Sequence, residues 1–210
     1  MTDILFAVAA GIPATIVTTA VSFLLGLALS LPLILLQRTQ VPLLGWLIRR
    51  LIDLIRAIPV LVWIFILYYG ITIGQFALDP FSAGIVALGV VSAAHLAEVG
   101  RTALEAIPRH QWEAARALGL SRPDTFWRVI IPQAIRIAIP SGTSFLLVLL
   151  KDSSIPSVIG VGEIAFHTTK VARSSGEPLV AFAAAVICYL LLSVPIGLLS
   201  RRGAVKVEVR

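Results

Sequence analysis

An uncharged apolar run from Gly11 to Leu36 is the feature that most restricts what this chain can fold into. Its roughly 26 residues exceed the ~20 that an α-helix needs to cross a bilayer, and they are too many for the apolar region of a signal peptide. The whole chain of 210 residues is 58% hydrophobic and 13% charged, with a mean hydropathy of +0.97. These values exclude an ordinary soluble domain and predict an all-α integral membrane protein.

Four further apolar stretches have a length that suits a membrane-crossing helix. Together with the first run, the predicted helices comprise residues 11–36, 57–75, 82–100, 132–150 and 179–200. No repeat and no low-complexity segment divides the sequence. Residues 1–210 are therefore predicted to form a single transmembrane domain with five helices.

The basic residues are distributed unevenly between the predicted connections. Fourteen of the 17 Lys and Arg residues lie in or beside the first and third connections or in the C-terminal tail. Lys170 and Arg173 lie in a connection on the opposite side, and Lys151 is not placed by this count. The positive-inside rule therefore predicts an N-terminus outside the cell and a C-terminus in the cytoplasm.

Composition and motifs also exclude several classes of protein. The single cysteine, Cys188, lies in an apolar stretch, so neither an intramolecular disulfide nor a metal site is expected. The net charge of +6 is accounted for by membrane topology, and no nucleic-acid partner is expected. No glycine is followed directly by lysine, so the chain lacks a phosphate-binding loop and is not predicted to be an ATPase.

The third connection contains the sequence WEAARALG, from Trp112 to Gly119. Its residues are strong helix formers up to Gly119, which is suited to end a helix in the left-handed conformation. We therefore expect a short cytoplasmic helix at residues 109–119, followed by a second helix with Ser121 as its capping residue. By this pattern alone, docking to a protein and lying on lipid head groups are about equally supported.

The order of residues in this segment resembles the EAA signature of permease subunits of ATP-binding-cassette importers. Glu113-Ala114-Ala115 is followed after three residues by Gly119, then after nine residues by Val129, one further residue and Ile131-Pro132. The family signature has Glu-Ala-Ala, three residues, Gly, nine residues, Ile, one residue and Leu-Pro. Only Val129 and Ile131 depart from it, and both are mild apolar changes.

Other segments resemble the permeases for polar amino acids, the group that includes histidine, glutamine and arginine importers. They are Arg56-Ala-Ile-Pro59 with Leu67-Tyr-Tyr-Gly70, Glu98-Val-Gly-Arg101, Ile107-Pro-Arg-His-Gln-Trp-Glu113 and Leu150-Lys-Asp-Ser-Ser154. The sequence departs from the group at His95, where Tyr is usual, at Trp63, where Gln is common, and at Ala57-Ile58, which replaces Gly-Thr. These departures leave the substrate open.

The resemblance implies the type I importer permease fold, with residues 109–119 as a coupling helix that docks on an ATP-binding subunit. The residues implied in coupling are Trp112, Glu113, Ala114, Ala115, Leu118 and Gly119. The implied partners are a second permease subunit, identical or homologous, two ATP-binding subunits and an extracytoplasmic substrate-binding protein. The chain itself would bind no cofactor, because ATP and Mg²⁺ are used by the partner subunit, and its location would be the bacterial cytoplasmic membrane.

Polar residues near the outer end of the fourth helix are candidates for the substrate pathway, because charges at membrane depth usually face protein or water. Lys151, Asp152, Ser153 and Ser154 follow about 19 residues of helix, which predicts a position in the outer half of the membrane. Asp152 is suited to an ammonium group, and the serines or backbone groups are suited to a carboxylate. An ion-pair network in an outer gate is an equally supported interpretation.

Three other polar or aromatic residues are candidates for the pathway, namely Ser92, His95 and Trp63. Ser92 and His95 are three residues apart and share one face of the predicted third helix. For His95, the pathway and simple packing are equally supported, and Trp63 is more typical of bundle packing than of a cavity wall. Structural or pairing roles are predicted for Glu98, Arg101 and Arg56.

The predicted function is that of a permease subunit that translocates a polar amino acid by alternating access. One alternative is a permease for a related solute, such as a compatible solute, an opine or methionine. A second alternative is a membrane scaffold or sensor that does not transport. A secondary transporter is less favoured, because the predicted midplane lacks a set of acidic residues for a coupling ion.

Overall fold

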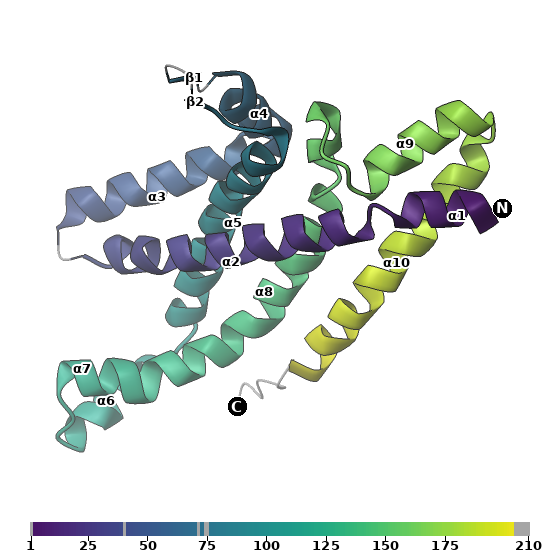
Figure 1. Ribbon diagram of the computed structural model, residues 1–210. Coiled ribbons are helices and arrows are strands. Elements are labelled where there is room, and N and C mark those ends of the chain that lie inside the picture. Colours follow the sequence, from purple (N-terminus) through teal and green to yellow (C-terminus); the bar gives the residue numbers. More distant parts are fainter. Residues whose placement is uncertain (1, 40, 71, 74–75, 204–210) are drawn as a thin grey trace.

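The computed structural model describes residues 2–39, 41–70, 72–73 and 76–203, and nearly all of them are helical (Figure 1). Along the chain, the elements are α1 (Thr2–Ala9), α2 (Ile12–Gln37), α3 (Pro42–Ala57), α4 (Val60–Phe65), η1 (Ile66–Gly70), β1 (Thr72–Ile73), β2 (Phe76–Ala77), α5 (Pro80–Glu105), α6 (Arg109–Ala117), α7 (Arg122–Asp124), η2 (Thr125–Ile130), α8 (Ile131–Asp152), η3 (Ile155–Ile159), α9 (Ile164–Ser175) and α10 (Pro178–Gly203). The short elements η1 and η2 are π-helical, η3 is a 3₁₀ helix, and β1 and β2 pair in antiparallel fashion.

Four helical stretches in the described part of the chain are long and apolar enough to cross a membrane. They are Thr2–Gln37, Pro80–Glu105, Arg122–Ile159 and Pro178–Leu198. A fifth span results when α3 and the following α4–η1 helix are taken together across a bend of 96°. The predicted all-α integral membrane class is confirmed.

The structure divides the second predicted span, residues 57–75, in a different way. The helix that begins at Val60 ends at Gly70, and its length of about 16 Å is too short to cross the hydrocarbon. The bent span is completed by α3, which runs back along α2 (Figure 1). The sequence predicts α3 to be part of a cytoplasmic connection instead. The break lies at Ile58 and Pro59, both with extended backbone, because proline disfavours a helical conformation in the residue before it.

The helix α5 is the centre of the bundle. Of its span, 61% is buried inside the protein, against 22% or less in the other three long spans. Its principal neighbour is α2, with α3 and α8 on its other sides. From α3, Ile52 is buried against Ala94 and Ala97 of α5.

The contact between α2 and α5 is made by small residues. On α2, the buried small residues are Thr15, Thr18, Thr19, Ser22, Gly26 and Ser30. A side chain at Gly26 would overlap Ser92 of α5, and one at Gly100 of α5 would overlap Ile34 of α2. Such residues allow two backbones to approach closely, which is the main source of helix association in lipid.

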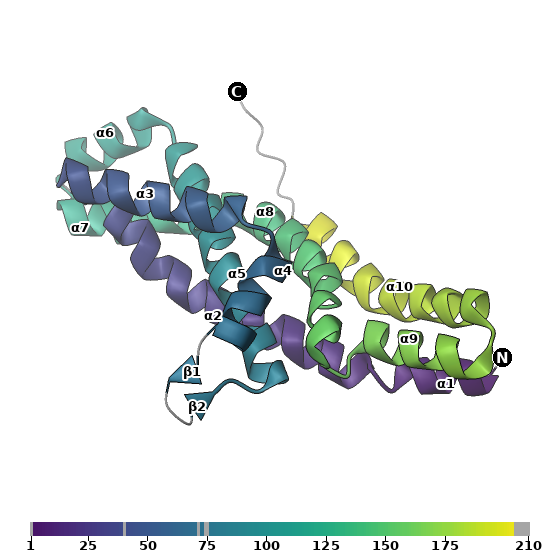
Figure 2. The ribbon, with the colours of Figure 1, turned by 90° about the horizontal axis from the view of Figure 1, so that it is seen from above.

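The two ends of the bundle have different structures. At one end, α1, α9 and α10 gather around a cluster that includes Val8, Ile164 and Cys188 (Figure 2). At the opposite end lie α6 and α7, beside the end of α2 and the start of α8 (Figure 1). The predicted coupling segment is therefore far from the end that carries the N-terminus.

The close approach of α2 and α5 predicts a large effect of one added methyl group. Gly26→Ala is expected to lower the free energy of unfolding by about 1–3 kcal/mol, because the methyl group overlaps Ser92 and the helices must separate. As a control, Gly197→Ala on α10 meets no atom within 4 Å and is expected to be neutral or stabilising by up to ~1 kcal/mol. Thermal unfolding of the detergent-purified protein measures both, and an unchanged midpoint for Gly26→Ala would contradict the tight contact.

Candidate functional site

The segment predicted to couple to a partner forms a helix and a tight turn. The helix α6 begins after Pro108, and Gly119 closes it with a φ of +77°, so the predicted left-handed glycine is confirmed. The helix ends at Ala117, two residues before the predicted end. Ser121 then caps the next helix by accepting a hydrogen bond from the backbone N–H of Asp124 at 3.2 Å, as predicted.

The six residues predicted to couple do not share one face of α6. Ala115 is 3% exposed, and half-buried Trp112 packs near Phe126 with a distance of 6.4 Å between ring centroids. Leu118 is 81% exposed. The outward surface, here called the docking face, consists of His110, Glu113, Ala114, Ala117, Leu118 and Gly119.

The inward side of α6 is attached to three membrane spans. Trp112 contacts a cluster whose buried members are Ala103, Leu104, Ile107, Ile130 and Ala134, from the segments around α5, η2 and α8. The guanidinium of Arg38, at the end of α2, lies over the ring of Trp112 at 5.8 Å and over that of Phe126 at 6.0 Å. Direct contacts therefore join α6 to α2, α5 and α8.

The charged pair at the far end of α8 has no ion-pair partner in the described part of the chain. Lys151 is exposed, and Asp152 is half-buried at the last residue of α8. The hydroxyl of Ser153 donates to the carbonyl of Leu150, and that of Ser154 to the carbonyl of Lys151, both at 2.7 Å. Because each hydroxyl has a single proton, neither serine retains a donor for a ligand in this arrangement.

A second polar group lies on α5 and at the end of α3. His95 stacks on Phe145 of α8, with 4.8 Å between ring centroids and an interplanar angle of 20°. Exposed Arg56 lies close enough to His95 and Glu98 for their charges to interact, and it has no ion-pair partner among the described residues. The stacked pair of His95 and Phe145, here called the His95 cluster, therefore joins α5 to α8, and both side chains are half-buried.

The remaining predicted residues take part in helix packing. Ser92 is fully buried against α2. The indole N–H of Trp63 donates to the carbonyl of Ile55 at 3.2 Å and so bridges the bend between α3 and α4. Glu98 accepts a hydrogen bond from Nε of Arg101 at 2.9 Å, and Arg101 also pairs with Glu105.

Sequence reasoning missed Glu163, a fully buried carboxylate at the opposite end from α6. Its oxygens accept hydrogen bonds from the backbone N–H of Ala165 at 2.9 Å, the backbone N–H of Phe166 at 2.7 Å and the hydroxyl of Tyr189 at 2.9 Å. Glu163 thereby caps α9 and attaches it to α10. The position before an apolar helix was the available signal, but glutamate is not among the usual N-cap residues.

Burial raises the pKa of Glu163 above its ordinary value, although its hydrogen bonds oppose the shift. The folded chain therefore holds this proton more tightly than the unfolded chain, and the associated stability is lost as the pH rises through the raised pKa. We expect the midpoint temperature of unfolding to fall as the pH rises from the ordinary pKa of a glutamate to the raised pKa of Glu163. Glu163→Gln should flatten the dependence, whereas Glu177→Gln, at an exposed glutamate, should keep it. Equal slopes for both variants in a pH series of thermal unfolding would contradict this role.

In the part of the chain that the structure describes, no group of three His, Cys, Asp or Glu residues is arranged to hold a metal ion. Three polar features with open surface include predicted site residues, namely the docking face, the Lys151–Asp152 pair and the His95 cluster. None of these contains a nucleophile beside a base. The arrangement suits binding and movement, and it lacks the elements of a hydrolytic centre.

Comparisons with known proteins give consistent matches over most of the chain. Residues 22–204 match the family described as "Binding-protein-dependent transport system inner membrane component". The L-cystine transport system permease of Bacillus subtilis is 34% identical over 187 residues, which cover 86% of this chain and 80% of that protein. The arginine ABC transporter permease of Haemophilus influenzae is 32% identical over 196 residues, 90% of this chain and 86% of that protein. A crystal structure of an amino acid ABC transporter with histidines matches with a TM-score of 0.83 and 28% identity, over 96% of this chain and 94% of that one.

Proposed function

Because this chain belongs to the family of binding-protein-dependent transport system inner membrane components, we propose that it is the permease subunit of an ATP-driven importer for a polar amino acid. It is a transport subunit and not itself an enzyme. The similarity to permeases for cystine and arginine supports a polar amino acid over a compatible solute or methionine. The observation that carries the proposal is the family match together with a helix at residues 109–117 whose outer face is open and whose inner face is attached to three spans.

We propose that the docking face fits a cytoplasmic ATP-binding subunit, which uses ATP and Mg²⁺. A ligand shifts an equilibrium between two conformations only if it binds one of them more tightly. Closure of the ATP-binding subunits supplies such a difference if it moves α6, since Trp112 and Arg38 connect this helix to α5, α8 and α2. Alternating access then follows from a change in how these spans are arranged around the pathway.

The proposed orientation places α6 and the C-terminus in the cytoplasm and the N-terminus outside the cell. It is supported by Arg38 at the end of α2 and by the six arginines from Arg101 to Arg136, in the segments around α6. Arg49, Arg50 and Arg56 lie on α3 and do not contribute to this support. The complete transporter would comprise a second permease subunit, identical or homologous, two ATP-binding subunits and an extracytoplasmic substrate-binding protein. Arg56 and the outer face of α3 would then face water or the second permease rather than lipid.

For the substrate, we propose contacts with Asp152 and Lys151. A polar amino acid carries an ammonium and a carboxylate, and these two side chains offer one charge of each sign without a competing ion pair among the described residues. Lys151 replaces the serines as the proposed carboxylate donor, since both hydroxyl protons are committed to helix carbonyls. The stacked pair of His95 and Phe145 would form a wall of the same pathway.

Gly119→Asp tests the coupling role. A Cβ added at Gly119 would meet no atom within 4 Å, so the added bulk and charge would project from the docking face. We expect ATP-driven uptake of labelled amino acids into proteoliposomes to fall at least about tenfold, equivalent to ~1.4 kcal/mol of lost docking energy. Gly176→Asp is a matched control, because Gly176 also has a positive φ and open surroundings but lies at the other end. Undiminished uptake by Gly119→Asp would refute the coupling assignment.

Asp152→Asn tests the substrate role. Loss of the negative charge should reduce uptake about tenfold or more, while the ATP-binding subunits still co-purify with the permease. Asp3→Asn, at an exposed aspartate of α1, should leave uptake unchanged. Loss of subunit association in Asp152→Asn would assign this residue to structure instead. Absence of uptake by the unmodified complex for every amino acid in a full panel would favour the scaffold alternative.

A further inference from the structure

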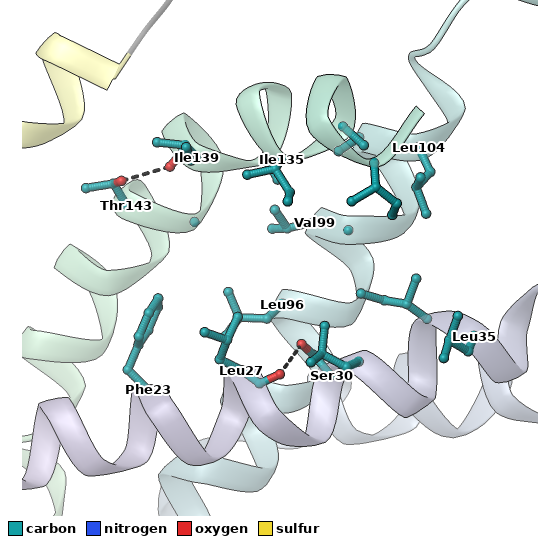
Figure 3. Close-up of a pocket in the computed structure, with 18 of the residues that line it drawn as sticks. Phe23, Leu27, Ser30, Leu35, Leu96, Val99, Leu104, Ile135, Ile139 and Thr143 are labelled. Carbon is teal, nitrogen blue, oxygen red and sulfur yellow. Dashed lines mark hydrogen bonds between the residues drawn. The ribbon is translucent and has the colours of Figure 1, made fainter. Parts of the chain in front are cut away.

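A cavity of about 680 Å³ lies between α2, α5 and α8 (Figure 3). Apart from Ser30 and Thr143, all its lining residues are apolar or glycine, and both hydroxyls donate to carbonyls of their own helices at 2.8 Å. In Figure 3, Leu27 of α2 and Ile135 of α8 lie on opposite walls, with Leu96 of α5 between the two helices. A surface with so few polar groups is unsuited to a polar amino acid, so this cavity, here called the apolar groove, is separate from the proposed substrate contacts.

The apolar groove is open at membrane depth. Several of its wall residues have half-exposed side chains, including Leu31 at 58%, Leu35 at 55% and Ile135 at 54%. Its floor contains small residues from two helices, among them Gly100 and Gly142. All the lining segments belong to spans long and apolar enough to cross a membrane. The groove is therefore accessible to lipid chains from the side.

The end of the groove nearest α6 is basic and aromatic. Arg38 follows the lining residues Ile34 and Leu35 by one helical turn, and its guanidinium lies 6.0 Å from the ring centre of Phe126, which lines the groove. Among the described residues, Arg38 has no carboxylate partner. Trp127, also a lining residue, is 62% exposed. Exposed tryptophan together with a basic residue at the end of a span is typical of the level of lipid head groups.

We propose that the apolar groove binds one acyl chain of an anionic phospholipid, whose phosphate is held by Arg38. Basic pockets between transmembrane helices bind anionic head groups in this way, with the chain in the apolar part of the pocket. The unpaired charge of Arg38 favours this occupant over an apolar helix, which would leave the arginine uncompensated. The proposed orientation of the chain would place this lipid in the cytoplasmic leaflet, and only that placement rests on the orientation.

A bound lipid in this position would affect coupling. It would fill the space between α2 and α8 next to the apolar cluster that contacts α6. Its phosphate would compete with the rings of Trp112 and Phe126 for Arg38. The same lipid would support both helices while they change arrangement. The transporter would then require anionic lipid for coupling, independently of any interaction with the substrate.

Native mass spectrometry of the purified transporter complex tests the lipid site. The complex is equilibrated in detergent with equal amounts of phosphatidylglycerol, which is anionic, and phosphatidylcholine, which is zwitterionic. We expect retention of phosphatidylglycerol with a preference of about fivefold, the size of effect that one basic side chain near an anionic head group produces. Equal retention of the two lipids, or retention of neither, would overturn the proposal.

Two pairs of variants localise the site. Gly142→Leu places a side chain in the groove without meeting an atom within 4 Å of its Cβ, and it should reduce lipid retention several-fold. Gly197→Leu, whose Cβ is equally unobstructed on α10, should not. Arg38→Gln should abolish the preference for phosphatidylglycerol, whereas Arg49→Gln, at an exposed arginine of α3, should preserve it. The comparison of Arg38→Gln with Arg49→Gln tests the lipid site even if the Gly142→Leu complex does not assemble.

A photo-crosslinking amino acid in place of Gly142 separates the two possible occupants. Crosslinks to phospholipid are expected, and crosslinks to a helix of the second permease would overturn the proposal. These measurements do not require transport. Lipid binding that persists in a complex without amino acid uptake would therefore support the lipid site and contradict the transport function separately.

Discussion

The close contact between α2 and α5 is the interaction on which the remaining structure depends. In lipid, apolar side chains gain little by leaving the hydrocarbon, so helices associate where small residues let their backbones meet. The hydroxyls along this contact are compatible with such burial because most are hydrogen-bonded, as with Thr15 to the carbonyl of Gly11 at 3.0 Å and Ser22 to that of Ile85 at 3.1 Å. With α5 held in the centre, α3 covers a second side and α8 diverges from α2, which creates the apolar groove.

Apolar length and local backbone chemistry made much of the fold predictable from the sequence. The first, third, fourth and fifth spans follow from long apolar runs, and the end of α6 follows from a glycine that adopts a positive φ. The path of α3 was not predictable, because Arg49, Arg50 and Arg56 indicated a cytoplasmic connection. An amphipathic pattern identifies a polar face, but it does not show whether that face meets the cytoplasm, a partner subunit or a water-filled pathway.

In the candidate site, the residue types that matter could be recognised from the sequence, but their contacts could not. The charges of Lys151 and Asp152 could be recognised as costly at membrane depth, but the use of both neighbouring serine protons by the helix end could not. Trp63 is a pathway candidate by residue type, yet its indole donates to the carbonyl of Ile55 across the bend at Pro59, a contact that residue type does not indicate. Glu163 escaped notice because a capping glutamate is uncommon and its partner Tyr189 lies 26 residues away in sequence.

The two sides of α6 are formed by different residues, so attachment to the bundle and the outward surface can change separately. Trp112 and Ala115 hold the helix to the bundle, whereas Glu113, Ala114 and Leu118 face outward without contributing to that attachment. Substitutions on the outer side can therefore accumulate without loss of the fold. A duplicated gene encoding such a permease could acquire a different energy-supplying partner through a handful of changes, while the machinery within the membrane is inherited intact.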